Sequence, residues 1–250
     1  MKYVGSKNRL SKELAPIIQS FINDSCNGYI EPFVGGANMI DKINHPNKIG
    51  FDIHKQLIEL LKYIQDLDNV LPVSISEDEY NKVKMNKNEY DDWYVGLVGF
   101  CGSFGSKYFG GYARGFKNDK ITPRDIPNES IRNLEKQRKN LQGIKFITSS
   151  FLDISITDIK NYVIYCDIPY KNTLKYVNGN FPYDDFYGWV KELSKNNVVL
   201  ISEYSMPDDF ECIWKKDVKV SIDSNKKEND KNSIRNEKLF MYKNGIKSLS

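Results

Sequence analysis

Hydrophobic and polar positions alternate in blocks near both ends of the chain. Amphipathic periods of three to four residues predict helices over 7–22, 55–65 and 184–194, with Pro16 expected to kink the first. Short apolar runs predict strands within 28–38, 48–54, 145–151, 162–166 and 198–202. Because strand, helix and strand alternate, we predict an open, mostly parallel α/β sheet. Two further strand-like stretches, 211–222 and 237–243, predict a C-terminal antiparallel hairpin with a long connection.

The middle of the chain departs from this alternation. From about Glu59 to Lys145 the pattern is helical and punctuated by glycine, with no clear signal for a parallel strand. We therefore predict two parts. Residues 1–58 and 146–250 form a sheet domain, and residues 59–145 form an inserted helical lobe.

Charge divides the predicted insertion into two halves. Residues 59–102 hold four Lys and nine acidic residues, whereas residues 103–145 hold ten Lys or Arg and four acidic residues. The basic half also contains five aromatic side chains: Phe104, Tyr108, Phe109, Tyr112 and Phe116. Basic side chains among aromatic rings and glycines suit a nucleic-acid backbone and unstacked bases. A solvated basic helix over 129–142 beside an aromatic patch explains the same composition.

Composition restricts the class of protein but does not indicate a function. A hydrophobic content of 40% supports a packed core, and the net charge of +3 places any basic surface in local segments. Four cysteines lack CxxC spacing and are expected to be reduced core residues: Cys26, Cys101, Cys166 and Cys212. The two histidines, His45 and His54, are expected to be surface residues beside helices rather than ligands. With no signal peptide or membrane span expected, we predict a soluble intracellular protein.

The first predicted strand runs into the sequence EPFVGGAN, where Gly35 and Gly36 allow a sharp turn and close approach to a ligand. We expect a new helix after this turn. The stretch matches neither GxGxxG nor a P-loop, and a purely structural turn also explains it. Asp52 ends the next strand, where an acid accepts hydrogen bonds from ribose hydroxyls or caps the following helix.

YCDIPY, residues 165–170, is the most specific stretch. Asp167 offers an acceptor to an amino group, and Pro169 restrains Ile168 so that a carbonyl points outward beside the carboxylate. Tyr170 supplies a face on which a planar base stacks. Two acceptors and a ring are what an exocyclic amine needs to become a nucleophile, because hydrogen bonds to both N–H groups aim its lone pair. A strand end with an Asp-Pro turn is the structural alternative.

Together these motifs resemble those of the Dam-like DNA N6-adenine methyltransferases, especially the phage-borne members. DIPY looks like a variant of the family's D-P-P-Y, EPFVGGAN resembles its S-adenosylmethionine turn, and KYVGSK at 2–7 resembles its amino-terminal cofactor motif. Two further stretches, SEYSMPDDFECIW at 202–214 and EKLFMY at 237–242, also resemble sequences of this family. The resemblance implies a Rossmann-like class I methyltransferase sheet with a target-recognition insertion.

The resemblance implies roles for single residues. The catalytic adenine site would be formed by Asp167, Pro169 and Tyr170. The cofactor S-adenosyl-L-methionine would contact Tyr3, Lys7, Glu31, Phe33, Gly35, Asp52 and Asp167. DNA contacts are expected from Lys107, Tyr112, Arg114 and Lys117. A surface position for Lys7 and a disordered terminus at Tyr3 are the alternatives. No metal is expected, because the cofactor's sulfonium is already activated.

The implied activity is site-specific methylation of N6 on a flipped-out adenine in double-stranded DNA. The enzyme would be a cytoplasmic monomer without an obligate protein partner, in a bacterial cell or a phage-infected host. Ile168 leaves open a weak or inactive DNA-binding protein, and an N4-cytosine or RNA methyltransferase would orient its amine in the same way. The basic, proline-containing stretch of GATC-specific members is not found, so their target is not inherited. Restriction-modification and replication control both fit as roles.

Overall fold

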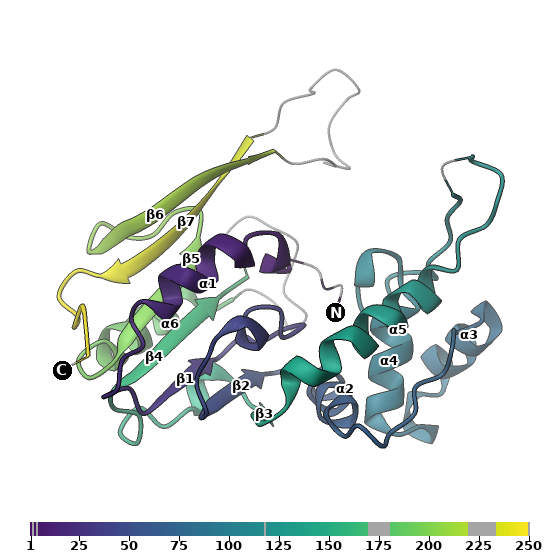
Figure 1. Cartoon of the computed structure of the whole chain (residues 1–250), viewed down its shortest axis with the longest axis horizontal. Coiled ribbons are helices and arrows are strands. Elements are labelled where there is room, and N and C mark those ends of the chain that lie inside the picture. Colours follow the sequence, from purple (N-terminus) through teal and green to yellow (C-terminus); the bar gives the residue numbers. More distant parts are fainter. Residues whose placement is uncertain (2, 4, 118, 170–180, 220–233, 250) are drawn as a thin grey trace.

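The computed structural model describes residues 1, 3, 5–117, 119–169, 181–219 and 234–249. A seven-stranded sheet forms its centre, in the order β3-β2-β1-β4-β5-β7-β6 (Figure 1). The strands are β1 Gly28–Glu31, β2 Lys48–Asp52, β3 Ile144–Thr148, β4 Tyr162–Asp167, β5 Val198–Glu203, β6 Phe210–Lys219 and β7 Ile234–Tyr242.

Strands β1 to β5 pair in parallel, whereas β7 pairs antiparallel with both β5 and β6. The predicted parallel sheet and C-terminal hairpin are therefore confirmed. Strand order reverses beside β1, because the chain continues outward to β2 and β3 and then returns to β4 on the other side. In open α/β sheets, ligands bind outside the carboxyl ends of the strands at such a switch point.

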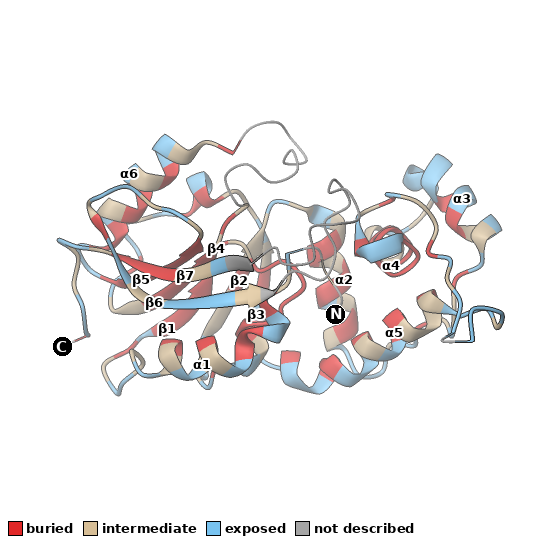
Figure 2. Ribbon diagram, turned by 90° about the horizontal axis from the view of Figure 1, so that it is seen from above, coloured by how far each residue is buried: buried red, intermediate tan, exposed pale blue. Residues whose placement is uncertain are grey.

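Alternating side chains of the central strands enter two cores, one on each face of the sheet. Val163 and Tyr165 of β4 pack in the cluster that contains α1 (Ser11–Gln19). Ile164 and Cys166 pack in the cluster that contains α6 (Tyr183–Leu193). The two helices cover opposite faces, and the buried strands lie between them (Figure 2). The hydrophobic run of β4 thus reflects burial on both sides, as parallel strands require.

Two sequence-predicted helices are shorter in the structure. The predicted helix over 7–22 consists of a 3-10 turn, Lys7–Arg9, followed by α1, which ends at Gln19 with Pro16 inside it. The Ser6 hydroxyl accepts from the Asn8 amide and starts the 3-10 turn. After EPFVGGAN no α-helix forms. The backbone passes through positive φ at Gly35 and Ala37, and the segment forms only the 3-10 turn Ile40–Lys42.

The described part of residues 53–143 is helical and contains no named strand, as predicted. Its helices are α2 Lys55–Gln65, α3 Glu77–Met85, α4 Asp92–Cys101 and α5 Ile126–Gln137, with 3-10 turns at Lys87–Glu89, Phe104–Ser106 and Arg138–Leu141. They form a lobe beside the β3 edge of the sheet (Figure 1). Helix α2 runs through position 59 without interruption. It packs closely on α4 because Gly96 of α4 has no side chain. A Cβ atom at this position would collide with the Gln56 carbonyl oxygen.

Cysteine and histidine placement differs from the sequence expectations at Cys212 and at His54. Cys26, Cys101 and Cys166 are buried and free, but Cys212 is exposed because it lies on β6 at the open edge of the sheet. His54 is half-buried and caps the start of α2. Among the described helices, none is long and apolar enough to cross a membrane.

Candidate active site

The carboxyl ends of β1, β2 and β4 place three acidic side chains on one edge of the sheet. Glu31 ends β1, Asp52 ends β2 and Asp167 ends β4. Because these strands are neighbours and parallel, residues far apart in the sequence meet where such sheets bind ligands. Three of the sequence-predicted residues, Glu31, Asp52 and Asp167, therefore lie on the same edge.

Asp52 holds the glycine turn in place. Its Oδ2 accepts from the Gly35 amide at 3.0 Å, and its Oδ1 accepts from the His54 amide at 2.9 Å. The helix-cap alternative for Asp52 is wrong, because the His54 ring accepts from Leu57 and is the N-cap of α2. Burial raises the pKa of Asp52, and the backbone donors oppose that shift. A carboxylate fixed in this way can still accept from a ribose hydroxyl, because each oxygen has two lone pairs.

Tyr3 lies against the same turn rather than at a free terminus. A side chain at Gly35 would come within 2.9 Å of the Tyr3 ring, and one at Gly36 would come equally close to its Cβ. The ring also lies 5.7 Å from the ring of Phe100 on α4. The two glycines therefore permit close packing of Tyr3 as well as the turn itself, where Gly35 has a φ of 49°.

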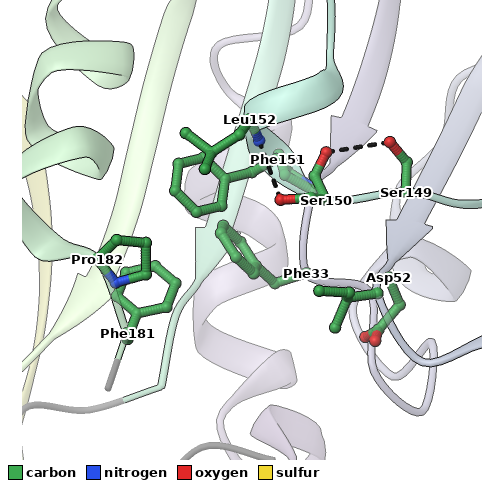
Figure 3. Close-up of a pocket in the computed structure, with 10 residues that line it drawn as sticks. Phe33, Asp52, Ser149, Ser150, Phe151, Leu152, Phe181 and Pro182 are labelled. Atoms are coloured by element: carbon green, nitrogen blue, oxygen red, sulfur yellow. Dashed lines mark hydrogen bonds between the residues drawn. The ribbon is translucent and has the colours of Figure 1, made fainter. Parts of the chain in front are cut away.

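A cavity of about 210 Å³ opens beside Asp52 (Figure 3). Phe33 and Phe151 form its apolar wall, and their ring centroids are 5.5 Å apart. The complete lining is Pro32, Phe33, Asp52, Ile53, Ser149, Ser150, Phe151, Leu152, Phe181 and Pro182. One carboxylate at the rim of an aromatic slot suits a flat heterocycle joined to a sugar. The volume lies below the roughly 300–1,000 Å³ of sites for drug-sized ligands, so the slot suits one part of a larger ligand.

Sequence reasoning found Phe33 and Asp52 but missed the part of the cavity lining that follows β3. Ser149, Ser150, Phe151 and Leu152 follow β3, and Ser150 is held by accepting from the Leu152 amide (Figure 3). For residues 145–151 the sequence predicts only a strand. The available signal was its position, since the segment after β3 must lie beside the carboxyl end of β2 in a parallel sheet.

Asp167 is engaged by Lys7, which joins the amino-terminal segment to the end of β4. The Lys7 Nζ lies 2.9 Å from Asp167 Oδ1 and 3.7 Å from Glu237 Oε2. Only 5% of Lys7 is exposed, so the surface alternative for this residue is wrong. Burial opposes its charge, but Asp167 and Glu237 together raise its pKa. Burial also raises the pKa of Asp167, and Lys7 offsets part of that rise.

The residues after Asp167 are anchored from both sides. The Ile168 side chain is 3% exposed and packs in the core that contains α6. Tyr183 at the start of α6 donates its hydroxyl to the Pro169 carbonyl at 2.8 Å. Ile168 and Pro169 are therefore fixed by packing and by a hydrogen bond. Tyr170, the predicted stacking ring, lies outside the described residues.

Glu31 is held differently from the other two acids. It is buried and accepts from the Tyr29 hydroxyl at 2.7 Å. Burial raises its pKa well above the usual range, which favours the protonated form. The structure thus places Glu31 at the end of β1, and its contact with the methionine part of a cofactor stays a prediction.

The predicted DNA contacts occupy different environments in the lobe. Lys107 and Lys117 are exposed. Arg114 is 69% exposed and forms a two-point pair with Glu77 on α3. Tyr112 is half-buried and donates its hydroxyl to the Ile75 carbonyl at 2.7 Å, which is a structural contact. Among the aromatic residues of the basic half, Phe109 is buried, whereas Phe104 and Phe116 are exposed.

The strand order, the antiparallel β7 and the glycine turn beside an acidic strand end define a Rossmann-like class I methyltransferase fold. The family model of the D12 class N6 adenine-specific DNA methyltransferases matches residues 3–196. The chain therefore belongs to this family, as its resemblance to Dam-like enzymes implied.

Two other comparisons are less informative. A solved structure of a proposed methyltransferase from Thermoplasma acidophilum is 8% identical, with a TM-score of 0.24. That similarity covers 47% of this chain and 55% of the other, so the chain spans about half the length of that protein. No curated protein matches the sequence significantly.

Proposed function

We propose that the protein transfers a methyl group from S-adenosylmethionine to the N6 amine of adenine in double-stranded DNA. The observation that carries this proposal is the position of Asp167. A carboxylate at the switch point, held by Lys7 and followed by a fixed Ile168–Pro169 segment, provides acceptors for the two N–H groups of an exocyclic amine. Membership of the adenine-specific family favours adenine over cytosine as the base.

The residues at the edge of the sheet fit the cofactor. The cavity beside Asp52 would hold its adenine against the rings of Phe33 and Phe151, and Asp52 would accept from its ribose hydroxyls. Gly35 and Gly36 would let the backbone approach its amino-acid part, because they carry no side chain. When bound, the cofactor supplies a methyl group attached to a sulfonium sulfur. The sulfur keeps the electrons of the broken bond and becomes a neutral thioether.

The side chains on the base side have an electrostatic task. As the amine nitrogen forms its new bond to carbon it gains positive charge, and it returns to neutral by losing one proton to water. A carboxylate at Asp167 stabilises that charge, and a fixed acceptor loses no energy in reorganising. Orientation of the amine supplies the rest of the rate enhancement, so no protein nucleophile is needed.

Access to the amine requires that the base leave the duplex, at a cost of a few kcal/mol. The basic half of the lobe, residues 103–145, would offset part of this cost through contacts to phosphates. Lys107 and Lys117 are exposed and would contact phosphates directly. Arg114 would have to break its ion pair with Glu77 before it could bind a phosphate.

The test is the isosteric change Asp167→Asn, assayed by transfer of labelled methyl groups to DNA followed by nucleoside analysis. We expect N6-methyladenine from the wild-type protein and at least about a 100-fold lower rate from the variant, because the charged acceptor is lost. Asp217→Asn, on the exposed surface of β6, is the matched control and should keep full activity. A fully active Asp167→Asn protein would refute the site.

A further inference from the structure

Glu237 is the least expected member of the charged cluster at the end of β4. It lies on β7, outside the residues that the family model matches. Its carboxylate is 3.7 Å from the Lys7 ammonium, which also contacts Asp167. The side chains of Lys7 and Glu237 are 5% and 14% exposed, so solvent screens their interaction only weakly.

The position of Lys7 creates a problem for catalysis. If the Lys7 ammonium formed an ion pair with Asp167 alone, it would neutralise the carboxylate that must stabilise positive charge on the amine. A second carboxylate close to the ammonium reduces that effect, because the cation is shared between two anions. Glu237 is placed to share it.

We propose that Glu237 is a positioning residue that shares the Lys7 ammonium and so leaves Asp167 with the negative charge needed during methyl transfer. This inference rests on the proposed function. Glu237 does not touch the substrate in this account, since it acts through Lys7. Lys7 orients Asp167 by binding Oδ1, and Glu237 limits how much charge that contact removes.

Other groups near Asp167 do not substitute for Glu237. Among the described residues, the charged or titratable side chains whose fields reach Asp167 include Lys7, Glu31, Tyr165, Cys166 and Glu237. Burial raises the pKa of Glu31, Tyr165 and Cys166 well above their usual values, which favours their neutral forms. Within this set of five, Lys7 and Glu237 are therefore the residues whose charge acts on Asp167, and Tyr204 adds a field on Lys7.

The pH dependence of Glu237→Gln separates this role from a structural one. Asp167 is active when ionised, so the rate falls as the pH drops through its pKa. The negative charge of Glu237 raises that pKa, and removing the charge should move the acid limb of the rate profile to lower pH. At the plateau, the loss of charge sharing should lower the single-turnover rate about tenfold. The variant should thus be slower but more resistant to acid.

Glu237→Asp and Glu211→Gln complete the experiment. Glu237→Asp keeps the charge, so its acid limb should stay at the wild-type pH and its plateau should lie above that of Glu237→Gln. Glu211→Gln removes an exposed acid of the same hairpin that pairs with Lys247, and should match the wild type. Cofactor affinity and the KM for DNA should change by less than about twofold in all three variants.

The outcomes are distinct. A wild-type protein that transfers no methyl groups to DNA would remove the proposed function itself. An active wild type with an unchanged plateau and acid limb in Glu237→Gln would overturn only the role of Glu237. A Glu237→Gln protein that melts at lower temperature and loses activity without moving the acid limb would reduce Glu237 to a structural contact, as would a Glu237→Asp protein with the same profile as Glu237→Gln.

Discussion

Ile168 occupies the position where the family signature has its first proline. The side chain points into the core that contains α6, and only 3% of it is exposed. A proline would fix this backbone through its ring, whereas Ile168 fixes it through burial. The catalytic segment therefore depends on packing at this position, which explains how the substitution is compatible with an ordered site.

This dependence predicts a graded effect of side-chain size. Ile168→Ala should lower the free energy of unfolding by about 2–4 kcal/mol, and Ile168→Val by about 0.5–1.5 kcal/mol, because each removes buried methyl groups. The methyl-transfer rate should fall in the same order as the carbonyl of residue 168 loses its anchor. Urea unfolding and initial rates measure both quantities. Equal stability of the two variants would show that the side chain is not held as the structure indicates.

At the residue scale, the sequence predicts groups that carry recognisable chemistry. The positions of Asp167, Asp52 and Gly35 after strands could be predicted because each follows an apolar run in the order of the family's motifs, although a turn or a helix cap explains each one alone. Ser150 could not, since a serine after a strand is common and its lining role depends on the neighbouring strand. The sequence singles out Glu237 only as part of a stretch that resembles the family. Its contact with Lys7 could not be predicted, because the position of β7 in the sheet sets that contact.

At the scale of elements, α6 both covers the sheet and positions the end of β4. Its first residue, Tyr183, donates to the Pro169 carbonyl, so the start of the helix restrains the exit of the catalytic strand. The Tyr183 ring also packs on Phe181 at the rim of the cavity. One helix start thus contacts both the proposed cofactor side and the proposed base side of the site.

Removal of one hydroxyl tests this link. Tyr183→Phe should lower the methyl-transfer rate about five- to tenfold, in line with a lost hydrogen bond of about 1 kcal/mol, with a smaller effect on cofactor affinity. Tyr187→Phe, one turn later on α6, is the control and should keep the wild-type rate. Stopped-flow or quench-flow turnover and cofactor titration give the two numbers. Equal rates in the two variants would remove the positioning role of Tyr183.

Helix boundaries show where pattern reasoning works and where it stops. The helix predicted over 55–65 coincides with α2, because its apolar stripe is uninterrupted and His54 caps it. The helix predicted over 7–22 fails at both ends, because Ser6 starts a separate 3-10 turn and α1 stops at Gln19 while apolar residues continue to Ile22. Local capping and tertiary packing decide such ends, and neither is visible in hydrophobic periodicity.

At the scale of the whole molecule, charge is separated within the lobe. The acidic half supplies α3, and the basic half supplies α5 and the segment that precedes it. Arg114 and Glu77 join the two halves through an ion pair. A phosphate backbone would be attracted to one half and repelled by the other, so DNA bound to the lobe as proposed would have a preferred orientation.

DNA binding should therefore weaken steeply with salt, and single lysines should contribute unequally. Lys117→Ala should reduce the slope of log affinity against log salt by about 1, the value for one phosphate contact. Lys84→Ala, an exposed lysine on acidic α3, should leave the slope unchanged. Fluorescence anisotropy over a salt series measures both slopes. A flat affinity for the wild-type protein would contradict the role of residues 103–145.

The cluster at Asp167 joins residues that the ribosome makes at very different times. Lys7 leaves the exit tunnel early, whereas Glu237 follows after 229 intervening positions. An unfinished polypeptide can therefore contain Lys7 and Asp167 before it contains Glu237. Under the proposed charge sharing, a chain that ended before β7 would keep the Lys7–Asp167 pair but lack the second carboxylate of the cluster.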